Sequence, residues 1–155
     1  MVERMKMTDK ELRGILEEHS KWLLSGRQEG CRADLSGADL GGANLKSVDL
    51  SRADLRNANL RNADFSGAKL GGANLRSADL RYANLRGTNL RYANLRDADL
   101  RNANLESAKL GGADISRADF SGADLRGADI SRADLSDDKE KLKIVKDGRN
   151  NENNR

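Results

Sequence analysis

A five-residue pattern, Ala-Asp/Asn-Leu-x-x, recurs 21 times between Ala33 and Asp137 without an insertion or a skipped residue. A large apolar residue stands at every fifth position of this region, and Ala precedes it by two positions in all but two repeats. Asp or Asn stands between them except at Lys69 and Lys109. The last two positions of the repeat are polar or small in nearly every copy, so we expect them at the surface.

A repeat of five residues does not fit either regular structure. On an α-helix of about 3.6 residues per turn, successive leucines would rotate by about 140° and would not form one buried stripe. Along an uninterrupted β-strand, side chains alternate between two faces, so an odd repeat would send alternate leucines to opposite faces. Neither a long helix nor a flat strand can therefore bury these leucines together.

A turn after each repeat brings every leucine to the same side. A short extended segment, Ala-Asp-Leu, then directs Ala and Leu inward and Asp outward, and the next two residues redirect the chain. Gly is common at the second of these residues because it tolerates positive φ. The chain is therefore expected to coil around an axis as a solenoid stabilised by stacked coils. The period alone does not decide between three and four sides.

The repeats Ala33–Gly37 and Ala58–Asn62, with their near-copies, resemble the motif of the pentapeptide-repeat family over 105 of 155 residues. This resemblance implies an all-β fold, a right-handed quadrilateral β-helix in which four repeats form one square coil. Residues 33–137 would then make about five coils. The open ends of such a solenoid need a cover.

The N-terminal segment, residues 1–32, is predicted to supply one cover. Residues 8–25 have the features of a helix, with Thr8 as N-cap, Glu11 completing a capping box and Gly26 after the last turn. We expect the helix to fold over the first coil as an N-terminal cap, with Trp22 as its largest anchor. Its apolar residues recur at helical spacing: Leu12, Ile15, Leu16, Trp22 and Leu23.

The C-terminal segment, residues 138–155, has two interpretations. A short helix over residues 136–146 would cover the last coil with Leu142, Ile144 and Val145, followed by a polar tail. If this segment does not cover the coil, the exposed strand edges would invite a second chain, and the protein would form an end-to-end homodimer. The sequence favours neither.

The repeat region is neutral overall, with 15 acidic and 15 basic side chains in residues 33–137, but its charge is banded. Residues 56–101 hold nine basic and four acidic side chains, and acidic residues predominate on both sides. In square coils, six arginines of this middle band stack in two columns on neighbouring faces. One column contains Arg56, Arg76 and Arg96, and the other contains Arg61, Arg81 and Arg101.

Two interpretations of these columns remain open. They form a docking surface for phosphates or for an acidic protein partner. Alternatively, each Arg neutralises an Asp two residues earlier, as in the pair Asp79 and Arg81, and so relieves repulsion along columns of carboxylates. An exposed pair of this kind contributes only about 0.2–1 kcal/mol.

Other partners and chemistries are not indicated. Tyr82 and Tyr92 fall on opposite faces of a square coil and cannot form one platform for stacked bases, so nucleic acid is not the expected partner. Acidic residues are spread one per repeat over each face, and no metal or other cofactor is expected. No triad or phosphate loop is present, and we expect no catalytic residue. His19 is expected to pack in the cap or lie at the surface, and Cys31 to be an inert thiol.

Two functions from different classes follow. The first is a non-enzymatic scaffold or protein-binding module, in the cytoplasm because residues 1–10 lack an apolar run. The second is implied by the resemblance, since some members of the family mimic DNA and bind gyrase or other type II topoisomerases, which protects these enzymes from drugs or toxins. DNA mimicry needs a strongly acidic surface, whereas this solenoid is neutral with a basic middle. The sequence therefore favours the first function.

Overall fold

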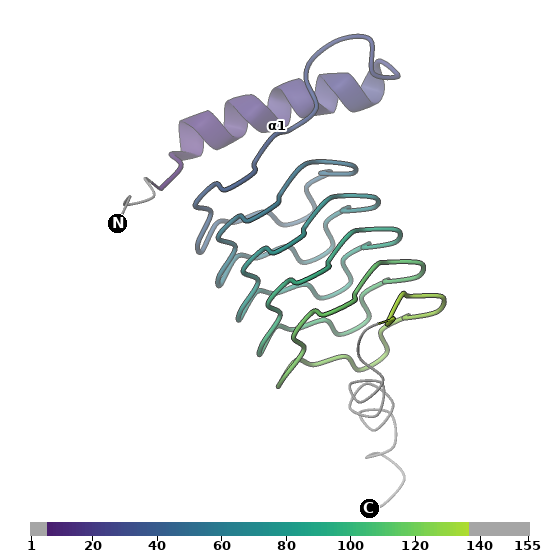
Figure 1. The fold of residues 1–155 in the computed structure, drawn as a ribbon. Coiled ribbons are helices and arrows are strands. Elements are labelled where there is room, and N and C mark those ends of the chain that lie inside the picture. Colours follow the sequence, from purple (N-terminus) through teal and green to yellow (C-terminus); the bar gives the residue numbers. More distant parts are fainter. Residues whose placement is uncertain (1–5, 137–155) are drawn as a thin grey trace, which may run out of the picture.

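The computed structural model describes residues 6–136, which form one helix and a stack of coils (Figure 1). The helix, α1, spans Asp9–Leu24 and lies across one end of the stack. Within residues 6–136, the coils contain no strand longer than a single bridged residue. The short extended segments predicted for each repeat are therefore reduced to one β-bridge, centred on the Asp/Asn position.

The bridges establish the geometry of the coil. From Asp34↔Asp54 onward, each bridge is parallel and joins a residue to its equivalent four repeats later, and the series continues without a shift to Asp114↔Asp134. One coil is therefore four repeats, which is the choice that the period left open. The structure is a β-solenoid whose four faces each collect every fourth repeat.

The interior of the solenoid is filled by two positions of the repeat. From Leu35 to Leu110, every large apolar residue at the third position of the repeat is at most 2% exposed, and the alanines of the inner coils are buried with them. Each such leucine contributes about 1.5–3 kcal/mol through burial, before the entropy of ordering the chain is considered. Thr88, which replaces Ala, is also buried, and its hydroxyl donates a hydrogen bond of 2.8 Å to the carbonyl of Phe65.

The backbone N–H groups of the repeat are satisfied by a fixed set of partners. The N–H of Ala donates to the leucine carbonyl of the preceding repeat, and the N–H of Asp or Asn donates to an Ala carbonyl of the preceding coil, as from Asp54 to Ala33. The N–H groups of Leu and of the fifth residue donate to the next coil, where the acceptors are carbonyls at the second and fourth positions. Four of the five donors are thus paired through the backbone alone.

The fifth donor explains the Asp/Asn position. In all 19 described repeats that carry Asp or Asn, the side-chain Oδ1 accepts a hydrogen bond of 2.9–3.3 Å from the N–H two residues later. This is an Asx-turn, in which the side chain replaces a backbone acceptor. Lys69 and Lys109 cannot accept such a bond.

The corner of each repeat is a turn with positive φ at the fifth residue. Every residue at this position from Gly37 to Arg132 has φ between +54° and +72°, although Gly occupies fewer than half of these corners. Together with the hydrogen bond from Ala to the leucine of the preceding repeat, this geometry matches a type II turn. The stacked coils therefore impose a left-handed backbone conformation on Ser, Asn, Arg, Tyr and Asp residues as well.

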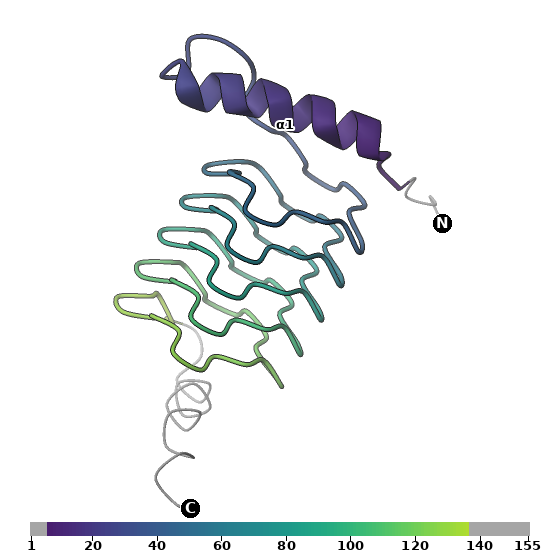
Figure 2. The ribbon, with the colours of Figure 1, turned by 180° about the vertical axis from the view of Figure 1, so that it is seen from behind.

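Helix α1 begins at a complete capping box, in which Thr8 and Glu11 exchange hydrogen bonds between side chain and backbone. Leu12, Ile15 and Leu16 of α1 pack against the buried core, and Figure 2 shows the helix crossing the first coil. No helix in the described part of the chain is long and apolar enough to cross a membrane.

The C-terminal half of α1 differs from the prediction. Trp22 and Leu23 are half-buried but are not among the hydrophobic residues that pack against the core. Trp22 instead stacks on His19, with ring centroids 5.5 Å apart, and the Arg27 guanidinium lies 5.5 Å from the Trp22 ring. His19, and not Trp22, is the fully buried side chain of this helix.

The connection from α1 to the first repeat packs closely against the helix. At Gly30, an added Cβ would collide with the backbone carbonyl of Glu18 and would lie 2.8 Å from the Trp22 nitrogen. The N–H of Cys31 also donates to the Glu18 carbonyl at 3.2 Å. These contacts fix the first repeat beneath α1. The predicted C-terminal helix, with Leu142, Ile144 and Val145, lies outside the described residues.

The Asx-turn can be tested at Asn89, whose Oδ1 accepts from the N–H of Arg91 at 3.1 Å. We expect Asn89→Ala to lower the free energy of unfolding by about 0.5–2 kcal/mol, because it leaves that N–H without an acceptor. Asn89→Asp keeps the acceptor and places a carboxylate between Lys69 and Lys109. The free energy of unfolding of this variant should therefore equal or exceed that of wild type. Urea unfolding measures the free energy of unfolding of both variants. An equal loss of stability in the two would contradict the role assigned to the Asn89 side chain.

The packing of the connection can be tested with two glycines that share a backbone conformation. Gly26 and Gly30 have φ of +67° and +71°, but only Gly30 has atoms within 4 Å of an added Cβ. Gly26→Ala should therefore cost only the strain of the left-handed conformation, about 1 kcal/mol. Gly30→Ala should lower the melting temperature clearly more than Gly26→Ala does, because backbone atoms near the added Cβ must also move. Similar melting temperatures for the two variants would show that the connection is not tightly packed.

Candidate functional site

The two predicted arginine columns lie on neighbouring faces of the solenoid. Members of one column occupy the same position in successive coils. Five of the six arginines have a carboxylate within 4.0 Å, and Arg61 is the exception among the described residues. The docking role of the columns remains a prediction, but most of their charge is compensated within the lattice.

Several of these arginines are held by an aspartate of the same repeat. Arg81 donates to Asp79 through Nε at 2.8 Å and Nη2 at 2.5 Å, and its Nε lies 3.4 Å from Asp99 of the next coil. Arg101 holds Asp99 in the same two-pronged way. These hydrogen bonds keep the pKa of Asp99 below its usual range. The column is thus a ladder of alternating charges.

In the other column, Asp54 of the same repeat holds Arg56, whereas a residue from the fifth position compensates Arg76 and Arg96. Asp97 is the one acidic side chain at that position in the described repeats. Its carboxylate lies 3.7 Å from Nε of both Arg76 and Arg96, and 2.9 Å from Nε of Arg117. One carboxylate therefore serves three arginines from three successive coils.

A different face carries an excess of positive charge. We call residues 48–52, 68–72, 88–92, 108–112 and 128–132 the basic face, since the bridges stack them in one column. On each of the other three faces, the acidic residues of the described repeats equal or outnumber the basic ones. The basic face carries only the acidic residues Asp49 and Asp129, against five basic ones: Arg52, Lys69, Arg91, Lys109 and Arg132.

The two aspartates of the basic face are already paired. Asp49 lies 3.4 Å from the Lys69 ammonium, and Asp129 lies 3.7 Å from the Arg91 guanidinium. Within the described part of the chain, the remaining three basic side chains form no ion pair: Arg52, Lys109 and Arg132. The sequence signal for this face was available, because Lys69 and Lys109 are eight repeats apart and so recur on one side of a four-repeat coil.

A hollow of about 620 Å³ interrupts the basic face at Gly111 and Gly112. Tyr92, which is 75% exposed, forms one side of it, and Arg132 lies on the other side. The Tyr92 ring rests on Gly112, where an added Cβ would lie 2.7 Å from Cε1 of the ring. The glycine pair therefore makes room for a flat aromatic side chain in an otherwise polar surface. Tyr82, 55% exposed, lies on the opposite face.

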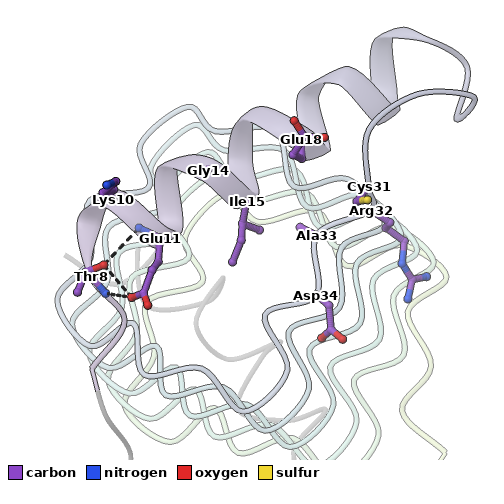
Figure 3. Close-up of a pocket in the computed structure, with 10 residues that line it drawn as sticks. All are labelled: Thr8, Lys10, Glu11, Gly14, Ile15, Glu18, Cys31, Arg32, Ala33 and Asp34. Atoms are coloured by element: carbon purple, nitrogen blue, oxygen red, sulfur yellow. Dashed lines mark hydrogen bonds between the residues drawn. The ribbon is translucent and has the colours of Figure 1, made fainter.

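A second hollow, of about 830 Å³, lies between α1 and the first coil (Figure 3). Ile15 points into it from the helix, and Ala33 forms part of its floor. Charged residues lie at its margin, but Glu11 is already engaged with Thr8 in the capping box. Cys31 is exposed here as a free thiol. The space is a gap left by the crossing helix rather than a convergence of reactive groups.

His19 joins α1 to the first repeat. Its Nδ1 accepts a hydrogen bond of 3.0 Å from the N–H of Ala33, so this nitrogen is unprotonated in the folded protein. Burial lowers the pKa of His19 below its usual range, although the carboxylate of Asp49 opposes the shift. A neutral, buried histidine that holds the first repeat is a structural element.

The chain matches the family model described as pentapeptide repeats, in 8 copies over residues 33–72, 68–106 and 98–137. Among solved structures, a pentapeptide repeat protein from the Arabidopsis thaliana thylakoid lumen is 36% identical, with 73% of this chain and 75% of that chain covered and a TM-score of 0.52. Rfr23, a pentapeptide repeat protein from the cyanobacterium Cyanothece 51142, is 28% identical, with 77% and 94% covered and a TM-score of 0.59.

A trypsin-treated variant of QnrB1, a plasmid-mediated fluoroquinolone resistance protein, is 28% identical over 66% of this chain and 63% of that chain. Its TM-score of 0.36 is too low to bear on function. The comparison with curated proteins gives no match.

The role of His19 predicts a pH dependence of stability. Because the pKa of His19 is lowered in the folded state, the unfolded state takes up the proton first as the pH falls. Its contribution to stability is therefore complete well above the unfolded-state pKa of 6.5 and is lost as the pH falls from that value through the lower folded-state pKa. Carboxylates in an unfolded chain titrate only at lower pH, near about 4.

His19→Asn keeps an acceptor for the N–H of Ala33 but cannot titrate. Its free energy of unfolding, measured with urea, should be flat between about pH 7.5 and pH 5, where that of wild type declines. An equal slope in both proteins would exclude His19 as the cause.

Proposed function

The chain belongs to the pentapeptide repeat family, and from that premise we propose that it is a non-enzymatic scaffold whose basic face binds a protein partner. One observation carries this proposal. The two repeats that forgo the Asx-turn, those of Lys69 and Lys109, lie on the same face. Each gives up a hydrogen bond that all other described repeats make, and each adds a positive charge to that face.

The loss of two turn hydrogen bonds has no counterpart in packing. Leu70 and Leu110, the core residues of these repeats, are as buried as their neighbours, and a lysine beside them adds nothing to the core. Lys109 has no carboxylate partner among residues 6–136, so it does not stabilise the lattice through an ion pair either. A binding role for the charge is the explanation that these contacts favour.

A non-enzymatic role is favoured because the polar side chains are already engaged. The Asp and Asn residues accept hydrogen bonds from their own turns, and arginines hold many of the same carboxylates. A general base or a nucleophile needs a side chain that is free to exchange a proton with a substrate. Charge on an otherwise rigid surface suits recognition of a partner.

The proposal retains the finer features expected from the resemblance. The solenoid winds right-handed with about five coils over residues 33–137, and the N-terminal segment 1–32 caps its first coil through α1. The predicted C-terminal cap and the alternative end-to-end homodimer both depend on residues 138–155, which lie outside the described residues. The protein acts in the cytoplasm without a cofactor.

The DNA-mimic alternative, binding to gyrase or another type II topoisomerase, is not supported by the charge distribution. An imitation of the duplex needs acidic residues along the rod, whereas no face of the described solenoid has an acidic excess of more than one. A gyrase supercoiling and cleavage assay with purified protein tests it directly. Inhibition or drug protection at about micromolar protein would replace the proposal with this alternative.

The proposed function is tested with two variants that each remove three positive charges. The first, Arg52→Asn, Lys109→Asn and Arg132→Asn, neutralises the basic face; Asn tolerates the left-handed corner and restores the turn at position 109. The second, Arg61→Ser, Arg81→Ser and Arg101→Ser, neutralises one arginine column with a residue that other repeats carry there. A partner captured from cell extract is identified, purified and titrated against the three proteins.

We expect the basic-face variant to lose about tenfold in affinity for this partner, from three charge contacts of about 0.5 kcal/mol each. The column variant should bind within about threefold of wild type. The opposite ranking would place the interaction on the arginine columns and would refute the basic face as the binding site. Thermal unfolding of both variants serves as the control for folding.

A further inference from the structure

We infer that the basic face recognises a short, extended, acidic peptide segment of its partner, seated across the hollow between Tyr92 and Arg132. This inference rests on the proposed function and specifies the chemistry of the ligand. Three features of the face carry it: the spacing of the basic side chains, the glycine-floored hollow and the single aromatic ring.

The spacing of the basic side chains suits an extended chain. Coils repeat at about 4.8 Å, so Lys69 and Lys109, two coils apart, are separated by about 10 Å along the axis, and Arg52 and Arg132 by about 19 Å. In an extended peptide, side chains of one face recur about every 6.6–6.8 Å. A segment of about six to eight residues with acidic side chains at alternate positions therefore spans the face.

The hollow provides the place where such a segment can approach the backbone. Gly111 and Gly112 carry no side chains, whereas Tyr92 and Arg132 rise on either side. The phenolic hydroxyl of Tyr92 and the hydroxyl of Ser131 can donate hydrogen bonds to carboxylates, in addition to the guanidinium of Arg132. Asp129, on the same wall, is already paired with Arg91 and so repels an acidic ligand less than a free carboxylate would.

A single-stranded nucleic acid fits the same face less well. Such ligands need a row of aromatic rings on which successive bases stack. The neighbours of Tyr92 in its column are Gly72 and Gly112, and the other exposed tyrosine, Tyr82, lies on the opposite face. Only one base could stack, and the remaining contacts would be to phosphates alone. A peptide needs only one apolar contact together with several carboxylate contacts.

The test uses the purified full chain and synthetic probes at low salt. The main probe is a fluorescein-labelled peptide of about eight residues that alternates Glu and Ser, and a peptide that alternates Lys and Ser controls for non-specific binding. An oligodeoxythymidine of the same length tests whether the charge serves nucleic acid instead. Binding is measured by fluorescence anisotropy for the wild type, the basic-face variant and the column variant defined above.

We expect the Glu/Ser peptide to bind the wild type. Its affinity should fall about tenfold or more for the basic-face variant, which carries Arg52→Asn, Lys109→Asn and Arg132→Asn. Its affinity for the column variant should differ from wild type by less than about threefold. The separate change Tyr92→Asn should also weaken binding of this peptide, although it leaves the net charge unchanged. Asn tolerates the left-handed backbone conformation of this corner. Tighter binding of the oligonucleotide than of the peptide, or equal loss in both charge variants, would overturn the inference.

Failure of this inference can be separated from failure of the proposed function. If the Glu/Ser peptide does not bind but the purified partner still needs the basic face, only the acidic-peptide assignment is wrong. If the partner binds equally to wild type and basic-face variant, the face is not the binding site and both proposals fail.

Discussion

The structure depends on one constraint, the pairing of backbone N–H groups at a fixed offset of one coil. Three donors of each repeat reach carbonyls of a neighbouring coil, the Ala N–H reaches the leucine carbonyl of the preceding repeat, and the fifth donor is satisfied by the Asp or Asn side chain of its own turn. A buried or half-buried donor without an acceptor would cost about 1–3 kcal/mol, so the register tolerates no insertion or deletion. This explains why 21 repeats follow one another without a skipped residue, and why Asp and Asn alternate freely while Leu and Ala hardly vary.

Little freedom remains once these demands are met. The first and third positions fill the core, the second closes the turn, and the fifth must accept positive φ. The repeats therefore differ from one another mainly at the fourth and fifth positions, with rare exceptions at the second position. When the residues are sorted by face, most variation serves the lattice: Arg81 and Arg101 alternate with aspartates, and Asp97 compensates three arginines. The basic face carries both second-position lysines, and three of its basic side chains, Arg52, Lys109 and Arg132, form no ion pair among the described residues.

The sequence predicted the solenoid, the inward direction of Ala and Leu and the capping box of Thr8 because each follows from a local rule. It could not choose four sides over three, because closure depends on hydrogen bonds between coils that a single period does not reveal. Trp22 looked like an anchor by size and spacing alone, but its partner is the buried ring of His19. The basic face was missed because charges were counted along the chain. Counted by position within a four-repeat coil, Lys69 and Lys109 would have fallen together.

The two lysines also show how a repeat protein can acquire a specific surface. A substitution at the fourth or fifth position leaves the backbone hydrogen bonds intact, whereas a lysine at the second position removes one acceptor from the turn. The adjoining residues reduce that cost, since each lysine repeat ends in Gly-Gly, which adopts the corner without strain. The same glycines lower the surface beside Tyr92 and create the hollow. Charge, cavity and loss of the turn hydrogen bond therefore occur together on one face.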